Sequence, residues 1–504
     1  MKISLPKSYY NNLSYIGTII AAIAVFMFVF LYVLSSISTI DRAYTGIVIF
    51  IIIPAFIILG LLLIPIGMIR RYRREKREGV IPKSQLLILD LNQPRHRNAT
   101  IVFVFGSLVF LFLSALGSYE AYHYTESVKF CGLVCHTIMK PEYTAYNQSP
   151  HARVSCAECH IGSGADWYVK SKLSGLYQVY AAVTNKYPRP IPTPVRNLRP
   201  ARETCEQCHW PEKIYGKQQR REIYILPDEN NTRWEIDLLM NTGGGNPAYG
   251  LSSGIHWHIN PDIEIEYVTT DRRRLTIPQV ILHNKISGET TVFNEAGEPF
   301  NETGAEWSER RTMDCIDCHN RPSHRYKDPG AFVNTVIAAG EISPSLPKIK
   351  LAAVEACMQD YPDEASAEAG ISEWIETFYQ ENYPAIAENK AAEITQAISS
   401  VKKAYSQNIF PVMKVKWEEY PDHIGHMTTL GCNRCHDGRH STADGRVITD
   451  DCRACHIISS QGVVGQMTYS TSEAGLDFIH PVDIEDAWKE MACSDCHSTP
   501  PVNY

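Results

Sequence analysis

Charge of either sign is missing from three long stretches near the start of the chain. No Asp, Glu, Lys or Arg occurs between Lys7 and Asp41, between Arg42 and Arg70, or between Arg97 and Glu120. The apolar cores of these stretches lie at about residues 15–37, 44–69 and 100–118. Each core reaches the ~20 residues that a helix needs to cross a bilayer. Buried helices of a soluble domain rarely run so long without charge. We therefore expect three transmembrane helices.

A strong excess of basic residues is also missing. The 504 residues carry a formal net charge of −7, and the sequence pI is about 6.2. Such a chain has no positive field to attract nucleic acid, so we expect no nucleic-acid partner. Its length allows several domains.

The first apolar run lacks a clear small-residue cleavage site and is too long for a cleaved signal peptide, so we expect an uncleaved signal anchor. The densest basic cluster beside the spans runs from Arg70 to Arg77 and continues with Arg95 and Arg97. By the positive-inside rule, the 70–98 loop and the N-terminus are cytoplasmic. Everything after about residue 120 is then expected outside the cytoplasm.

Almost no cysteine is left over from one repeated pattern. Fourteen of the fifteen cysteines form seven pairs, and each pair is followed directly by a histidine. The pairs are Cys131/Cys135, Cys156/Cys159, Cys205/Cys208, Cys315/Cys318, Cys432/Cys435, Cys452/Cys455 and Cys493/Cys496, followed by His136, His160, His209, His319, His436, His456 and His497.

A Cys-x-x-Cys-His run is typical of c-type haem attachment, because two thiols add to the haem vinyl groups and the histidine ligates the iron. The first motif has three residues between its cysteines, and we interpret it as a haem site with a wider loop. Zinc sites do not require a histidine directly after the second cysteine. The sequence therefore predicts seven covalently bound haem c groups. The remaining Cys357 is expected to be a small buried residue.

Several stretches around the first four motifs resemble the NapC/NirT/NrfH family of membrane-anchored quinol dehydrogenases. They are Cys135 to Tyr143, Ser149 to Ala152, Cys156 to Ile161, Leu198 to Cys205, and Cys315 to His319 with His324. The resemblance covers about residues 119–215 and 312–326. The complete plan, with three membrane helices ahead and three haem motifs behind, is similar to the seven-haem inner-membrane cytochromes of metal-respiring bacteria.

The resemblance implies a protein of the bacterial inner membrane with periplasmic haem domains, in agreement with the predicted orientation. It also implies oxidation of menaquinol and delivery of electrons to periplasmic c-type cytochromes, in anaerobic or extracellular respiration. Two features depart from the family, which usually has one transmembrane helix and two residues between the cysteines of the first motif. The sequence leaves open whether the protein forms a homo-oligomer.

We expect a mainly α fold with irregular haem-wrapping loops, three transmembrane helices and a small β insertion in an extracytoplasmic multihaem cytochrome c. Strand-forming runs occur at Glu222–Leu226, Ile263–Val268 and Gln279–Leu282. Residues 330–405 have helical spacing and predict two or three spacer helices. The expected domains are a membrane domain (1–118), a tetrahaem domain (119–326) with a β insertion at about 216–310, a helical spacer (327–410) and a C-terminal trihaem module (411–504).

Each low-spin haem needs a second axial ligand besides its motif histidine. Ten further histidines lie beyond the membrane segments, and we expect about two in three of them to be ligands. Apart from His123 and His283, the candidates are Met139, His151, His256, His258, His324, His423, His426, His440 and His480.

Some of these candidates are favoured over the others. The resemblance implies axial roles for His151 and His324, and a role for Met139 at the first haem iron, although a surface methionine is the alternative. His440 and His480 lie in short loops near motifs. Alternation in a strand would place His256 and His258 on one face, and we expect at least one of them to be a ligand.

The quinol site is expected on the helix from Ala165 to Tyr180, at the membrane surface next to the haem nearest the lipid. Its apolar face contains Val169, Leu173, Leu176, Val179 and Tyr180. Lys172 falls within this face and matches the position of the family's quinol-binding lysine, whereas a snorkelling lysine is the alternative. Lys170 lies to its side. The acidic residue that family members carry further along is not found here, and Gln178 lies in that neighbourhood. We therefore expect either Asp166 or Glu142 to accept the proton.

Two other functions compete. A terminal reductase for nitrite or hydroxylamine needs an open iron position, often marked by Lys in place of the motif histidine, and no Cys-x-x-Cys-Lys occurs. A passive membrane anchor of a partner reductase is the second alternative. Whether the isolated protein oxidises quinol distinguishes it from a quinol dehydrogenase.

Overall fold

The computed structural model describes residues 7–37, 48–79, 90–162, 164–194, 200–214, 216–243 and 253–498. The Asp41–Arg42 turn, residues 80–89 of the basic loop and the stretch before Pro200 lie outside the described residues. Internal contacts divide the chain into two units, and each is described by itself. The first comprises residues 1–139 and 155–157, and the second comprises residues 140–154 and 158–504.

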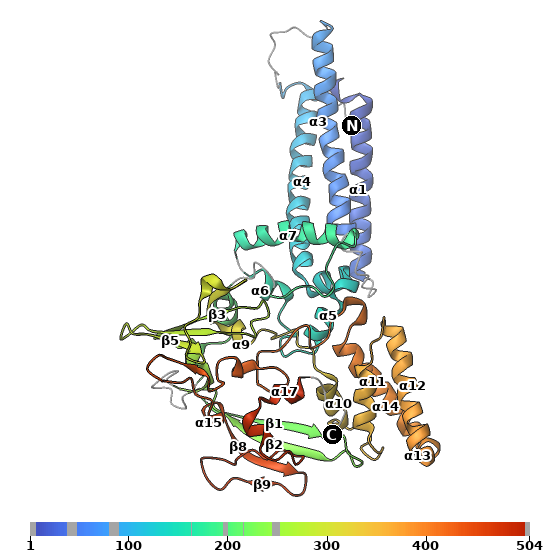
Figure 1. Ribbon diagram of the computed structural model, residues 1–504. Coiled ribbons are helices and arrows are strands. Elements are labelled where there is room, and N and C mark those ends of the chain that lie inside the picture. The colour runs from blue at the N-terminus through green and yellow to red at the C-terminus, as the bar shows by residue number, and fades with distance from the viewer. Residues whose placement is uncertain are drawn as a thin grey trace. The chain divides into compact units, whose positions relative to one another are not determined.

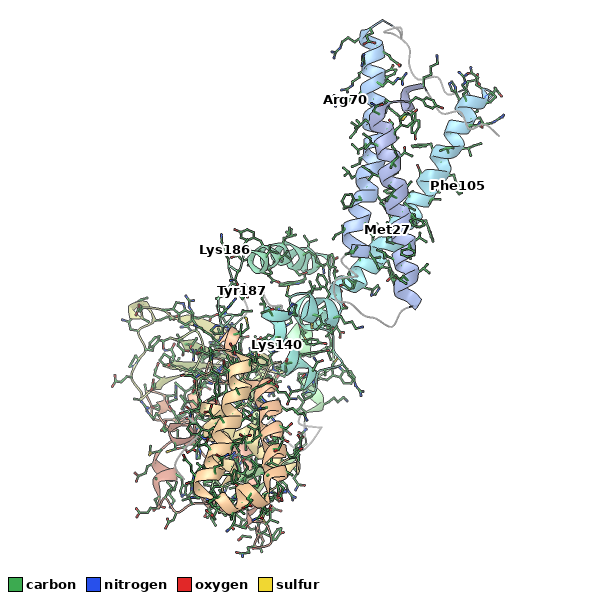
Figure 2. The ribbon with its side chains drawn as sticks, turned by 90° about the vertical axis from the view of Figure 1, so that its right-hand side faces the viewer. Met27, Arg70, Phe105, Lys140, Lys186 and Tyr187 are labelled. Carbon is green, nitrogen blue, oxygen red and sulfur yellow. The ribbon has the colours of Figure 1, made fainter. Side chains whose placement is uncertain are left out.

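The first unit contains three helices that are long and apolar enough to cross a membrane, as predicted. After a short 3-10 turn at Lys7–Tyr9, they are α1 (Asn12–Ile37), α3 (Ile53–Arg77) and α4 (Pro94–Glu126) (Figure 1). A π-helical turn, η2 (Val48–Ile52), precedes α3. Arg70, labelled in Figure 2, begins the basic end of α3, which stays helical to Arg77.

Small residues let α1 and α3 approach backbone to backbone. A Cβ atom added to Gly17 would lie 2.6 Å from the carbonyl oxygen of Gly60, and one added to Gly60 would lie 2.6 Å from the backbone nitrogen of Ala21. The Ser14 hydroxyl donates to the carbonyl oxygen of Ile64 (3.0 Å). In lipid, where apolar burial does not drive helices together, such close packing and interhelical hydrogen bonds hold them.

The outer side chains of α4 have little packed against them. None of the apolar window of α4 is buried within the described part of the chain, and the Phe105 ring, labelled in Figure 2, is 68% exposed. Apolar rings left open in this way suit a lipid environment.

The largest apolar core of the second unit belongs to five consecutive helices (Figure 1). They are α10 (Pro329–Ala338), α11 (Ile349–Met358), α12 (Glu364–Asn382), α13 (Pro384–Asn389) and α14 (Ala391–Asn408). The sequence predicted two or three helices here. The structure has five, because the caps at Asp328 and Asp363 and the proline at Pro384 each begin a new helix. Cys357 is 2% exposed inside this core, which confirms its prediction as a buried residue.

Two antiparallel sheets complete the second unit. The first has the order β1 (Gln218–Ile225), β2 (Arg233–Met240), β8 (His456–Val463) and β9 (Thr468–Tyr469). The second has the order β6 (Glu309–Thr312), β3 (Ile263–Thr269), β4 (Gln279–Asn284), β5 (Thr290–Glu295) and β7 (His440–Ser441). The three predicted strands lie in β1, β3 and β4. However, β7, β8 and β9 come from the C-terminal segment, so that segment and the insertion share both sheets.

The haem motifs occupy short helices joined by irregular chain. These are η3 (Phe130–Val134), α6 (Cys156–His160), α8 (Ala201–Cys205), α9 (Cys315–Cys318), η9 (Gly431–Arg434), α15 (Cys452–Cys455) and α17 (Cys493–His497). Other short turns are η4 (Pro211–Lys213), η7 (Glu302–Gly304), η8 (Pro411–Met413) and α16 (Ala487–Glu490). The predicted mainly α fold with loops around the motifs is confirmed.

Replacing Gly60 by Leu should destabilise the membrane unit. The new side chain would start 2.6 Å from the Ala21 backbone, and overpacking of this kind costs about 1–3 kcal/mol or more. Thermal unfolding in detergent, followed by circular dichroism, should show a lower midpoint. Gly106→Leu on α4 is the matched control, because nothing lies within 4 Å of an added Cβ there. Equal midpoints for the two variants would contradict the packing.

Candidate functional site

The extra residue of the first motif is taken up by a π-helical turn. Residues Phe130–Val134 form η3, and α5 (His136–Asn147) begins at the motif histidine. A π turn bonds i to i+5 and thus holds one more residue per turn than an α-helix, often at functional sites. The wider Cys131–Cys135 spacing therefore has a regular local structure, and Cys135 remains next to His136.

His136 and Met139 lie three residues apart on α5, with the Met139 amide bonded to the Cys135 carbonyl (2.9 Å). Side chains three apart on a helix share one face. Two axial ligands must approach an iron from opposite sides. The geometry therefore makes His136 and Met139 alternatives for one axial position of one haem, and not its two ligands together.

Each of the other six motif histidines faces a second histidine. An imidazole nitrogen binds a metal at about 2 Å, so two rings on opposite sides of one iron have centroids about 6 Å apart. The observed centroid distances are 6.0 Å for His209–His151, 6.1 Å for His160–His324, 6.3 Å for His319–His256, 5.7 Å for His436–His258, 6.1 Å for His456–His426 and 6.1 Å for His497–His480. These residues fit a haem iron between each pair.

The motif cysteines differ in how far the protein covers them. A cysteine that carries a large apolar group is expected in an enclosed place, and nine of the fourteen are partly buried. The structure disagrees with that expectation at the remaining five, whose side chains are exposed: Cys159, Cys208, Cys432, Cys452 and Cys496.

The exposure has a physical reason in the local fold. Cys159, Cys208 and Cys496 are each the second cysteine of a motif. Cys159 and Cys496 lie in a short helix, and Cys208 lies in the turn that follows α8, three residues after its end. So short a helix covers a thiol from one side only. An exposed thiol is also accessible to the vinyl group with which it has to react. Each of the three directly precedes a motif histidine that faces a second imidazole, so attachment through them stays a prediction.

The paired histidines come from segments far apart in the sequence. His256 and His258 lie on a 3-10 helix, η6 (Ile255–Ile259), and face His319 and His436 respectively. The prediction that strand alternation would put both on one face is wrong, because the segment is helical. One short helical turn therefore carries the histidines that face the fourth and the fifth motif.

Two expected ligands are placed differently. The Nδ1 of His440 lies 2.9 Å from a carboxylate oxygen of Asp437, and its Nε2 lies 2.7 Å from the carbonyl oxygen of Ile277. His423 contacts two carbonyl oxygens, those of Asp317 (3.0 Å) and Arg273 (2.9 Å). Burial, followed by the charge of Arg434, lowers the pKa of His423 to about 4. Because both nitrogens of each ring are engaged by protein atoms, the structure does not support the axial roles expected for His440 and His423.

His283 and His123 have other neighbours. The Nδ1 of His283 lies 2.9 Å from the Thr290 hydroxyl on the neighbouring strand. The His123 ring meets Tyr119 edge to face, with centroids 4.4 Å apart. The sequence favoured neither as a ligand, and neither faces a motif histidine within the described residues.

A buried carboxylate inside the fourth motif fixes two motifs to each other. Asp317, 1% exposed, accepts from the Tyr267 hydroxyl (2.6 Å) and from Arg274 (3.2 Å) and Arg311 (3.2 Å). Its carbonyl oxygen accepts from Arg434 of the fifth motif (2.8 Å). The sequence interpretation missed this centre, although an acidic residue between motif cysteines and an arginine in the next motif were visible signals.

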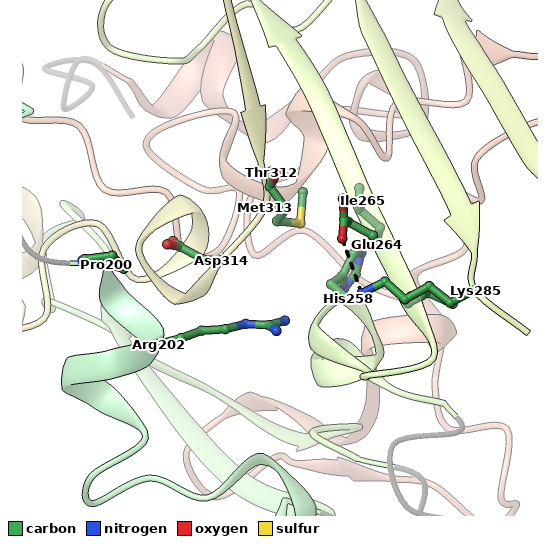
Figure 3. A pocket seen from close by; sticks show the side chains of 10 residues that line it. Pro200, Arg202, His258, Glu264, Ile265, Lys285, Thr312, Met313 and Asp314 are labelled. Carbon is green, nitrogen blue, oxygen red and sulfur yellow. Dashed lines mark ion pairs between the residues drawn. The ribbon is translucent and has the colours of Figure 1, made fainter.

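A cavity lies beside His258 (Figure 3). Met313 lines it from one side, and Arg202 and Lys285 bring positive charge to it, with Lys285 Nζ 3.2 Å from Glu264. An apolar wall next to an imidazole suits a porphyrin face, and cationic side chains suit its carboxylates. Glu264 and Asp314 also line the cavity, so its lining carries charge of both signs, and Arg202 is the cation in it that is not paired with a lining carboxylate.

Within the residues that the structure describes, no group of three or more His, Cys, Asp or Glu side chains is arranged to hold a metal ion. All fifteen cysteines are free of disulfide bonds, as thioether attachment requires.

Helix α7 (Ala165–Val183) exposes its large apolar side chains. Leu173 is 63% exposed, Leu176 69% and Val183 82%, whereas the small Ala181 is buried. A helix on a soluble surface buries its large apolar residues. The inverted pattern is typical of a helix whose apolar face meets a membrane interface, as the sequence predicted.

The two lysines of α7 sit over aromatic rings. The Lys172 ammonium lies 4.7 Å from the centroid of Tyr168, and Lys170 lies 4.7 Å from that of Trp167. Lys172 is half-buried and Lys170 is exposed. Gln178 is exposed near Ser174, about half a turn around the helix from Val169 and therefore away from the apolar face. The side chain of Asp166 lies outside the described residues.

Glu142 is already engaged. Its Oε2 lies 2.9 Å from Nδ1 of His324, and its Oε1 lies 3.6 Å from Arg321. Burial acts to raise the pKa of Glu142, but the His324 contact and the Arg321 charge outweigh it and lower the pKa to about 2. A carboxylate held ionised in this way is a weak proton acceptor for quinol.

Comparisons with known proteins agree with the motifs. Residues 93–190 match the model of the NapC/NirT cytochrome c family, N-terminal region. The cytochrome c-type protein ImcH of Geobacter sulfurreducens is 43% identical over 493 residues, which is 97% of this chain and 95% of that protein. No solved structure matches. The resemblance drawn from the sequence is thereby confirmed.

Replacing His480 by Ala should open one haem to added ligand, because His480 faces the seventh motif histidine. Carbon monoxide titration of the reduced protein should show one more binding haem than in the wild type. His440→Ala is the control, since His440 is bound to Asp437 and Ile277, and it should add no such haem. A new binding haem in His440→Ala, or none in His480→Ala, would overturn this distinction.

Proposed function

The chain belongs to the NapC/NirT family of membrane-associated, haem-c-binding cytochromes, and on this premise we propose that it oxidises menaquinol and passes the electrons to periplasmic c-type cytochromes. The observation that carries the proposal is α7, whose exposed face is apolar and contains a lysine at its edge. A quinol arrives from lipid, so its site needs an apolar approach together with a polar group that can bind its hydroxyl.

Lys172 is the group we assign to the quinol oxygen. At 100° per residue it falls between Val179 and Val183 on the apolar arc, whereas Lys170 points about 100° away from Val169. The ammonium beside the Tyr168 ring has an aromatic neighbour that favours a cation. From this position it would donate a hydrogen bond to the quinol oxygen and stabilise the negative charge that develops as the proton leaves.

The proton acceptor is then not Glu142, because that carboxylate is committed to His324 and Arg321. Asp166, at the start of α7 and six residues before Lys172, is the remaining candidate from the sequence.

We propose seven haem c groups, held by the fourteen motif cysteines. Six irons would have two histidine ligands each, in the pairs given above, and either His136 or Met139 would supply one ligand of the first. Arg202 would pair with a haem carboxylate beside His258. Bound haem c supplies the one-electron chemistry, while the chain sets ligation, burial and hydrogen bonding.

The proposed location of the two units rests on the distribution of basic residues. The basic end of α3, from Arg70 to Arg77, would lie in the cytoplasm, and the second unit would lie in the periplasm of a bacterial inner membrane. The facing histidines also weigh against a terminal reductase, because six of seven motifs already have a second imidazole within ligand distance.

Replacing Lys172 by Met should slow quinol oxidation about tenfold or more, since a hydrogen bond to a charged group is worth about 1.5–3 kcal/mol. Stopped-flow haem reduction by a menaquinol analogue measures the rate, and the haem content should be unchanged. Lys170→Met is the matched control and should keep the wild-type rate, because Lys170 lies off the apolar arc. Equal rates in Lys172→Met and wild type would contradict the site. A protein that takes no electrons from quinol at all would instead favour the passive anchor.

A further inference from the structure

His324, which faces a motif histidine, also contacts the carboxylate of Glu142. Nδ1 of His324 lies 2.9 Å from Oε2 of Glu142 and 3.2 Å from the backbone carbonyl oxygen of the same residue, while the ring faces His160 of the second motif. At four other paired histidines, Nδ1 meets a backbone carbonyl oxygen. These contacts are His256–Thr242 (2.8 Å), His258–Ile255 (2.7 Å), His480–Val482 (2.7 Å) and His151–Pro322 (3.4 Å).

The carboxylate is held in place from its other side. Arg321 lies 3.6 Å from Oε1 of Glu142, and its Nε donates to the carbonyl oxygen of His324 (2.7 Å). The guanidinium also lies beside two rings, 4.5 Å from the centroid of Tyr420 and 5.2 Å from that of Tyr326. Arg321 therefore fixes the backbone of His324 and the carboxylate that contacts its ring.

From this geometry we propose that Glu142 is a positioning residue that lowers the reduction potential of the haem in the second motif. A carboxylate 2.9 Å from Nδ1, beside the carbonyl oxygen that Nδ1 also meets, makes the imidazole a stronger donor. A stronger donor stabilises the oxidised iron, and hydrogen bonding of this kind sets haem potentials. A carbonyl acceptor, as at the other paired histidines named above, is neutral and polarises the ring less. The inference rests on the proposed pairing of His324 with His160.

The test is a spectroelectrochemical titration of the full-length protein with its haems, in detergent. His324→Met first identifies the component that belongs to this haem, because a thioether ligand raises the potential relative to two histidines. Glu142→Gln should then move the same component upward and leave the others in place. Haem content and the low-spin signal should stay at wild-type levels, since His324 itself is kept.

Glu364→Gln is the matched control. Glu364 pairs with Lys140 at 2.9 Å, two residues before Glu142, so the change removes one carboxylate near the same helix without touching His324. It should shift no component. If Glu142→Gln fails to fold beside Arg321, Glu142→Asp keeps the charge but shortens the reach to Nδ1, and it should shift the same component upward.

The outcomes separate the tuning role from the ligand pair. If His324→Met moves one component and neither Glu142 variant moves it, the tuning role is overturned and the ligand pair stands. If His324→Met leaves every component and the low-spin signal unchanged, the proposed pair itself is overturned. An equal shift in Glu364→Gln would show a general charge effect and would likewise overturn the specific role of Glu142.

Discussion

The proposed ligation requires two imidazoles on opposite sides of one iron, and six pairs of facing histidines in the second unit meet this requirement. A motif supplies the first ring and both covalent attachments within five residues, but the second ring must come from elsewhere at about 6 Å between centroids. The chain meets this need with segments far away in sequence, such as His256 against His319 and His151 against His209. Each of these two pairs brings together segments far apart in the sequence.

The β insertion and the C-terminal segment, which the sequence assigned to different domains, contact each other in the second unit. One 3-10 turn brings His256 and His258 to the fourth and fifth motifs, and the buried Asp317 joins the same two motifs through Arg434. Strands β7 and β8 pair with β5 and β2 of the insertion, and β9 pairs with β8. The helices α10 to α14, by contrast, bring no paired histidine and form an ordinary apolar core.

Local features were predictable from the sequence, and long-range ones were not. Uncharged runs predicted the membrane helices, and the Cys-His spacing predicted the motifs, because both signals lie within one segment. His440 resembled His480, since each lies in a short loop near a motif, yet Asp437 and Ile277 occupy the nitrogens of the first while His497 faces the second. Such a distinction depends on what packs across from a side chain. The extra residue of the first motif, an irregularity in sequence, has a regular place as a π turn.

We propose that six haems have two histidine ligands each, in the pairs of facing imidazoles. Near-infrared magnetic circular dichroism of the oxidised wild-type protein, scaled to its haem content, counts such haems directly. At least six haems with two imidazole ligands are expected among those bound. A signal that corresponds to fewer than six would contradict this ligation.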